Sequence, residues 1–105
     1  MRFVETPIFT KVITALLDDE SYRGLQSALI RRPEQGPTIG GTHGARKVRW
    51  ARPGAGKRGG IRVIYYWARN RDQLLMLLMY PKSERDDLTR SQLKLLRKLV
   101  EEEYQ

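Results

Sequence analysis

The hydrophobic pattern of the first third of the chain predicts one strand and two helices. Residues 2–5 alternate polar and apolar side chains, which is typical of a short strand. Residues 7–17 carry apolar side chains at helical spacing, and Thr6-Pro7 offers an N-cap followed by a proline at the first helical position. The acidic residues 18–20 begin a second helix, whose apolar stripe continues to residues 31–33.

The period of the pattern changes to two after a glycine-rich segment. Residues 34–45 contain several Gly and Pro without periodicity and predict a loop. Two alternating segments follow, at residues 47–50 and 61–67. The connection between them, residues 52–60, holds one proline and four glycines, so we expect a hairpin.

Cations occupy one side of these predicted strands. Lys47 and Arg49 alternate with apolar residues and therefore share one face of the first strand. Arg62 is an isolated charge on an otherwise apolar second strand. Such a residue is either a paired structural ion or a functional group.

The last part of the chain predicts a buried strand and a capped helix. Residues 74–80 are seven consecutive apolar residues, and their short length between Asp72 and Pro81 favours a central strand covered on both faces over a helix. Thr89 and Gln92 form a T-x-x-Q capping box, and apolar residues at helical spacing follow as far as Tyr104. The predicted fold is a compact α+β domain over residues 1–105, with a small antiparallel sheet, two N-terminal helices and a C-terminal helix.

The charge of the 105-residue chain is concentrated in its middle. The formal net charge is +8, with 20 Lys and Arg against 12 Asp and Glu. Residues 35–71 contain no Asp or Glu and carry nine of the Lys and Arg, so the whole excess lies in this block. Solubility alone would be served by mixed signs, so the block indicates a surface that binds phosphates.

Composition excludes several kinds of site. With no Cys and one His, His43, the chain offers neither thiol chemistry nor a multi-His metal site. The segment ending in Gly56-Lys57 fails the phosphate-loop pattern, because Lys57 is followed by Arg58 rather than Ser or Thr. The acid-free strands disfavour a two-metal nuclease. Glu84, Asp86 and Asp87 either favour the start of the last helix or hold basic side chains in place. We expect no metal and no cofactor.

The sequence has no apolar run long enough to span a membrane and no signal-peptide pattern at its N-terminus. We therefore expect a cytoplasmic protein.

The remaining possibility is a reaction that Lys and Arg side chains can catalyse by themselves. RNA supplies its own nucleophile, the 2′-hydroxyl, so Arg and Lys side chains suffice to position the phosphate and stabilise developing charge. Crowding by other cations favours the neutral amine of a lysine, the form that acts as a general base. Lys47 fits this role, and Lys57 and Lys82 are alternatives.

Further cations and aromatic residues are candidates for binding RNA. The cations are Arg46, Arg52, Lys57 and Arg58. Tyr66 and Tyr80 are candidates for stacking on bases, whereas Tyr65 and Trp67 share a face with apolar residues and are expected in the core. His43 is expected at the surface rather than in acid–base catalysis.

Three segments together resemble the HigB-type branch of the RelE/ParE toxin superfamily. They are GGTHGARKVRW at residues 40–50, GKRGGIRVIYY at 56–66 and YPKSERDDLT at 80–89. The resemblance implies a toxin of a type II toxin–antitoxin pair that cuts mRNA on the ribosome. It also implies a cognate antitoxin, a HigA-like DNA-binding protein, as partner.

The resemblance also assigns roles to individual residues. It places Lys47, Arg49, Arg62 and Lys82 at the catalytic positions. RelE-like sequences have a second basic residue after the position of Lys82 and a tyrosine a few positions further on. This chain has Ser83 and Thr89 there, so either Tyr66 or Tyr80 replaces the family tyrosine, or stacking is less important in this member.

Two other functions are compatible with the same basic block. One is a non-catalytic inhibitor of DNA gyrase, as in ParE-like relatives. The other is a basic nucleic-acid-binding module without toxicity. The dense cations on the two predicted strands favour RNA cleavage over gyrase binding, and normal growth on induction without the antitoxin would support the non-toxic module.

Overall fold

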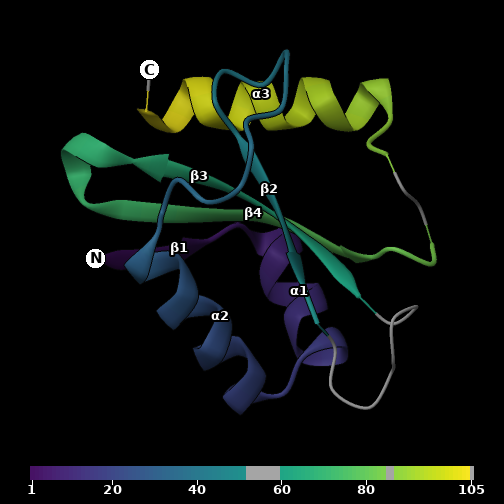
Figure 1. Cartoon of the computed structure of the whole chain (residues 1–105). Helices are drawn as coiled ribbons and strands as arrows, with labels where there is room; N and C mark the ends of the chain where they lie inside the picture. The colour runs from purple at the N-terminus through teal and green to yellow at the C-terminus, as the bar shows by residue number, and fades with distance from the viewer. Residues whose placement is uncertain (52–59, 85–86, 105) are drawn as a thin grey trace.

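The computed structural model describes residues 1–51, 60–84 and 87–104. The helices are α1 (Pro7–Leu16), α2 (Asp19–Arg31) and α3 (Arg90–Tyr104), and the strands are β1 (Arg2–Glu5), β2 (Arg46–Trp50), β3 (Ile61–Ala68) and β4 (Gln73–Pro81), with a single 3₁₀ turn, η2 (Arg69–Arg71), between β3 and β4. The elements follow the predicted order, and Figure 1 shows them around one sheet. The α+β prediction is confirmed.

The sheet is mixed, whereas the sequence predicted an antiparallel one. Its strand order is β1-β4-β3-β2, and the β4–β3 and β3–β2 pairs are antiparallel as expected. The β1–β4 pair is parallel, with Phe3 opposite Leu74. Parallel pairing needs a long connection, and two helices and two strands separate β1 from β4 in the chain. The local pattern of residues 2–5 carries no signal for this choice.

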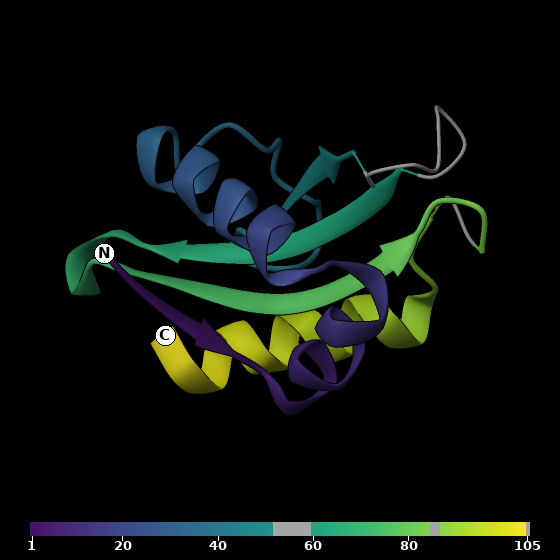
Figure 2. The same ribbon diagram turned by 90° about the horizontal axis from the view of Figure 1, so that it is seen from below.

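The sheet is covered on both faces, and this explains the apolar run of β4. Helices α1 and α2 lie on one face and α3 on the other (Figures 1 and 2). The first face forms a core around Phe9, Leu25, Leu29 and Tyr65. The second forms a core in which Leu96 and Val100 of α3 meet Leu75 and Leu77 of β4. A strand with both faces buried has no solvent-facing positions, so its sequence is a continuous apolar run rather than an alternation of polar and apolar residues.

A bulge in β4 interrupts the alternation of its side chains. Ile64 pairs with Leu78 and Tyr65 with Met76, which leaves Leu77 as the extra residue. The Leu77 carbonyl accepts a hydrogen bond from the Thr6 hydroxyl at 2.8 Å. The same hydroxyl oxygen accepts from the Phe9 amide at 3.1 Å, so Thr6 both caps α1 and stabilises the bulge.

The predicted helix starts are confirmed in detail. Pro7 follows the Thr6 N-cap, and Asp18 caps α2 by accepting from the Ser21 amide at 2.7 Å. The reciprocal bonds of the capping box join Thr89 and Gln92 at 3.0 and 3.1 Å. Within the part of the chain that the structure describes, no helix has the length and apolar character to cross a membrane.

Candidate active site

The basic residues of three strands meet at one end of the sheet. β2 ends here, β3 begins here, and β4 runs out here into Lys82, whose amide donates to the Gly60 carbonyl at 3.0 Å. Arg49 is the penultimate residue of β2 and Arg62 the second residue of β3. The antiparallel topology thus brings together cations that are far apart in the sequence.

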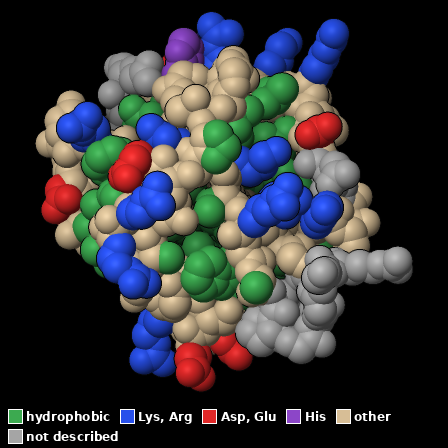
Figure 3. Space-filling model, viewed as in Figure 1, with side chains coloured by type: hydrophobic (Ala, Val, Ile, Leu, Met, Phe, Trp, Pro, Cys, Tyr) green, Lys and Arg blue, Asp and Glu red, His purple; other side chains and the backbone are tan. Residues whose placement is uncertain are grey.

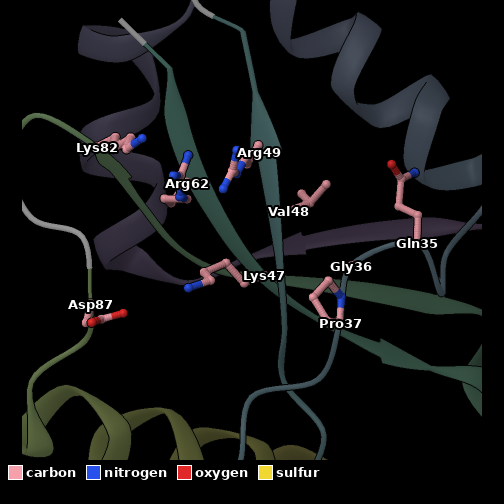
Figure 4. Close-up of a pocket in the computed structure, with 9 residues that line it drawn as sticks. All are labelled: Gln35, Gly36, Pro37, Lys47, Val48, Arg49, Arg62, Lys82 and Asp87. Carbon is pink, nitrogen blue, oxygen red and sulfur yellow. The ribbon is translucent and has the colours of Figure 1, made fainter. Parts of the chain in front are cut away.

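The four cations Lys47, Arg49, Arg62 and Lys82 line one open cavity of about 670 Å³, which we call the cationic cleft. Gln35, Gly36, Pro37, Val48 and Asp87 complete its lining. Lys and Arg side chains gather on this side of the molecule (Figure 3), and Figure 4 shows Arg49 and Arg62 side by side with Lys47 below them. These four are the residues that the sequence proposed as catalytic.

Arg62 is buried without a carboxylate partner. Only 6% of the residue is exposed, and it has no ion pair among the described residues. Burying a guanidinium costs several kcal/mol unless a partner offsets it. The structure therefore provides no support for the interpretation of Arg62 as half of a structural ion pair.

The neighbours of Arg62 across the sheet increase this cost. Arg62 is the register partner of Arg49 on β2 and of Tyr80 on β4. Like charges directly opposite each other in an antiparallel pair are destabilising. The register of Arg49 with Arg62 therefore adds to the cost of burying Arg62.

The wall of the cleft opposite Lys82 is formed by Gln35, Gly36 and Pro37 (Figure 4), which belong to a short segment, residues 33–37, that we call the strap. The buried Tyr65 hydroxyl donates to the Pro33 carbonyl at 2.7 Å and accepts from the Gly36 amide at 3.0 Å. Burial raises the pKa of the Tyr65 phenol. The strap also joins the edge of the sheet, because the Lys47 amide donates to the Pro37 carbonyl at 3.1 Å.

Arg46 belongs to the support of the strap rather than to the lining of the cleft. Its Nη1 donates to the carbonyls of Glu34 and Gly36, at 2.9 and 2.8 Å. The side chains of β2 alternate, so Arg46 points away from the face that carries Lys47 and Arg49. The structure thus separates Arg46, expected to bind RNA, from the four cations of the cleft.

Of the two tyrosines expected to stack on bases, Tyr80 lies in the core beneath α3 and Tyr66 packs against that core. Tyr80 is 6% exposed, and Tyr66 is half-buried against the same apolar cluster. Neither lines the cationic cleft. Tyr65 is fully buried in the core beneath α1 and α2, and Trp67 packs against the same core, as expected. The candidates Arg52, Lys57 and Arg58 lie outside the described residues.

His43 lies at the surface, where it contacts α3. Glu101 Oε1 lies 2.6 Å from His43 Nε2 and 3.2 Å from Arg97 Nε. Arg97 and His43 together hold the pKa of the Glu101 carboxyl below its usual value. The contact joins the loop before β2 to the helix that covers the sheet, and it lies outside the cleft.

Asp87 is the acidic residue of the cleft lining within the described part of the chain. It lies before α3, across the cleft from Lys47 (Figure 4). Of the other two acids in this segment, Glu84 is exposed and outside the cleft lining, and Asp86 lies outside the described residues. Over the same described ranges, no group of three or more His, Asp or Glu side chains is arranged to hold a metal ion.

Sequence reasoning missed the strap as part of the site. Gln35, Gly36 and Pro37 lie in a segment whose glycine and proline content predicted only a loop. Their position depends on Tyr65 and Arg46, about 10 to 30 residues further along the chain, and no local pattern encodes such contacts.

An α+β domain whose sheet ends in a cationic cleft is the arrangement expected of a small toxin of the RelE type. The family model for the RelE toxin of the RelE/RelB toxin–antitoxin system matches residues 10–105. The chain therefore belongs to the RelE toxin family and is a toxin of a toxin–antitoxin system, with a cognate antitoxin as its partner.

Proposed function

We propose that this protein is a ribosome-dependent mRNA endoribonuclease of the HigB-like branch, acting in the cytoplasm and without a metal ion. The observation that carries the proposal is Arg62, which is buried beside Arg49 in the cationic cleft and has no ion pair among the described residues. A protein retains such a costly arrangement where it binds and activates a phosphate. Family membership supports a toxin, and the three segments noted above favour HigB among its branches.

The proposed reaction is an internal transfer at phosphorus. The 2′-oxygen of one nucleotide forms a bond to the adjacent phosphorus while the bond from phosphorus to the 5′-oxygen of the next nucleotide breaks. A base takes the 2′-hydroxyl proton, and an acid gives a proton to the departing 5′-oxygen. The products are a 2′,3′-cyclic phosphate and a 5′-hydroxyl, and neither an added nucleophile nor a redox partner is needed.

The arginines and lysines of the cleft suit different parts of this reaction. Arg62 and Arg49 present planar guanidinium groups, which bind a phosphate through two N–H donors at once and stabilise the charge of the transition state. Lys47 and Lys82 line the same cleft and are the candidates for proton transfer. The cations thereby provide the charge stabilisation that metal ions provide in other nucleases.

The antitoxin that we propose is a HigA-like DNA-binding protein. An acidic segment of that partner would be attracted to the block of cations in residues 35–71 and would cover the cleft or close its entrance. The complex would then be inactive on mRNA.

A translation extract tests the catalytic assignment. Wild-type protein is expected to cut mRNA, whereas Arg62→Ala and Lys47→Ala lose at least about a hundredfold in rate, the range for a transition-state donor or a general base. Arg23→Ala removes an exposed cation from α2 and is the matched control, with unchanged cleavage expected. Full cleavage by both cleft variants would overturn the assignment.

A gyrase inhibitor related to ParE is the alternative, since it belongs to the same superfamily. Induction of the toxin without its antitoxin separates the two activities. Arrest of methionine incorporation before thymidine incorporation is expected for mRNA cleavage. Early arrest of thymidine incorporation with a DNA-damage response would instead support gyrase inhibition.

A further inference from the structure

The cationic cleft has two chemically different halves. Lys47, Arg49, Arg62 and Lys82 form one half, together with Asp87, and the strap with Val48 forms the other, which carries no charged group in the lining. The cleft volume of about 670 Å³ lies within the range of pockets that enclose whole small molecules. If the charged half holds a phosphate, the neutral half is left for the base attached to it.

Gln35 is the polar side chain of the neutral half, and its amide has a fixed orientation. Its Nε2 donates to the carbonyls of Ala28 and Arg32, at 2.8 and 3.1 Å, at the end of α2. Both partners are acceptors, so only the nitrogen of the amide can face them. The oxygen must therefore face the other way.

Figure 4 shows the result of this anchoring: the Gln35 nitrogen lies on the side of α2 and the oxygen on the side of the cleft. No described residue donates a hydrogen bond to this Oε1. The backbone on both sides is held as well, since the Gln35 amide donates to the Arg32 carbonyl at 3.1 Å and Gly36 is fixed by Tyr65. Oε1 is thus a preorganised hydrogen-bond acceptor beside a phosphate-binding site.

We propose that Gln35 determines base specificity: its Oε1 accepts a hydrogen bond from the exocyclic amino group of an RNA base lodged against the strap. Adenine, cytosine and guanine carry such a group, whereas uracil offers only its ring N3–H, which lies between two carbonyl oxygens that repel Oε1. The toxin should therefore prefer A, C or G over U at the nucleotide in this half of the cleft. The proposal rests on the proposed function in that the ligand is RNA.

Two variants of Gln35 separate specificity from structure. Gln35→Lys keeps a donor for the Ala28 and Arg32 carbonyls but removes the acceptor, whereas Gln35→Met removes both. Ser27→Lys adds the same charge at an exposed position of α2 and serves as the control for charge. Thermal unfolding of each variant checks that the fold is kept.

The first measurement is cleavage of four synthetic mRNAs that differ only in the base at the cut site. The wild type and Ser27→Lys are expected to cut at A, C or G about three- to tenfold faster than at U, the factor of one neutral hydrogen bond. Both Gln35 variants are expected to lower the rates at A, C and G to the rate at U. Equal preferences in the wild type and both variants would overturn the proposal and leave the nuclease intact.

The second measurement is independent of cleavage. Titration with adenosine, cytidine and uridine 3′-monophosphates, followed by NMR at the backbone amide of Gly36 in the same wall of the cleft, should show tighter binding of the two amino-bearing nucleotides, and the Gln35 variants should lose this difference. If mRNA is not cut but this discrimination is present, the nuclease proposal fails and the base site stands. If discrimination is absent as well, both fail.

Discussion

Arg62 is a residue whose placement favours function over stability. It lies nine-tenths buried with Arg49 opposite and no described carboxylate beside it. Replacing buried ionic groups with apolar residues of similar size often stabilises a protein by about 1–4 kcal/mol. Because the buried charge of Arg62 lowers the stability of the fold, we infer that it is retained to bind a ligand in the cleft.

Arg62→Met should therefore abolish cleavage while raising the free energy of unfolding by about 1 kcal/mol or more. For a domain of this size, that change raises Tm by roughly 4–8 °C. Thermal unfolding followed by circular dichroism measures it, with Arg23→Met as a control at an exposed position. A marked fall in Tm for Arg62→Met alone would show that Arg62 is structural.

Tyr22, unlike Arg62, stabilises the folded protein. Its hydroxyl donates to Glu5 Oε2 at 2.7 Å, and burial together with this carboxylate raises its pKa far above the ordinary value of 10. The folded state thus holds the phenol proton more tightly than the unfolded state. The stabilisation is complete below pH 10 and is lost as the pH rises above it.

Urea unfolding at a series of alkaline pH values tests this sign. The wild type should exceed Tyr22→Phe in stability by a constant margin up to about pH 10, and the margin should shrink at higher pH. A margin that grew with pH would contradict the role assigned to the Tyr22–Glu5 hydrogen bond.

At the scale of elements, the strap joins α2 to β2 and forms one wall of the cleft. Gly36 permits this, because a Cβ atom there would lie 2.8 Å from the Lys47 carbonyl oxygen and 3.1 Å from the Tyr65 hydroxyl. Since the first contact is with backbone, a side chain at Gly36 must push the strap away from β2.

Gly36→Ala is expected to cost about 1–3 kcal/mol of stability and to lower cleavage activity, because the wall moves relative to Lys47. Gly40→Ala is the matched control, since nothing lies within 4 Å of its Cβ position. Unfolding curves and cleavage rates of both variants test the prediction. Equal effects of the two substitutions would show that the close packing of the strap is unimportant.

The elements themselves could be predicted from local pattern, because caps, periodicity and glycine content act over a few residues. Thr6, Asp18 and the Thr89–Gln92 pair begin the helices as predicted. The parallel pairing of β1 with β4 and the bulge at Leu77 could not be predicted, because both depend on contacts about 70 residues apart.

For the candidate site, residue type and position in a strand could be read from the sequence, whereas the three-dimensional contacts of each residue could not. Lys47, Arg49, Arg62 and Lys82 stood out as cations on or beside apolar strands, and the structure brings them into one cleft. Arg46 is a cation of the same kind, but its hydrogen bonds to the strap only become visible in three dimensions.

At the scale of the whole molecule, the net charge of +8 arises from one block of the chain. Such an asymmetric charge attracts an oppositely charged partner over distances of about one Debye length, roughly 10 Å at 0.1 M salt. The association of the toxin with its antitoxin should therefore be fast at low salt and slower when the charges are screened.

Stopped-flow mixing of toxin and antitoxin measures this effect. The association rate constant is expected to fall at least about tenfold between low and high salt, while the dissociation rate changes less. An association rate independent of salt would show that the basic block is not what attracts the antitoxin.

The most direct test of the central claim concerns the ends of the cleaved RNA. Ribosome-bound mRNA cut by the wild-type toxin should carry a 2′,3′-cyclic phosphate or its ring-opened product upstream of the cut and a 5′-hydroxyl downstream. A single 2′-deoxynucleotide immediately upstream of the cut site should abolish cleavage. Continued cleavage of the deoxy-substituted mRNA, leaving a 5′-phosphate, would contradict a site that works through cations and the 2′-hydroxyl of the RNA.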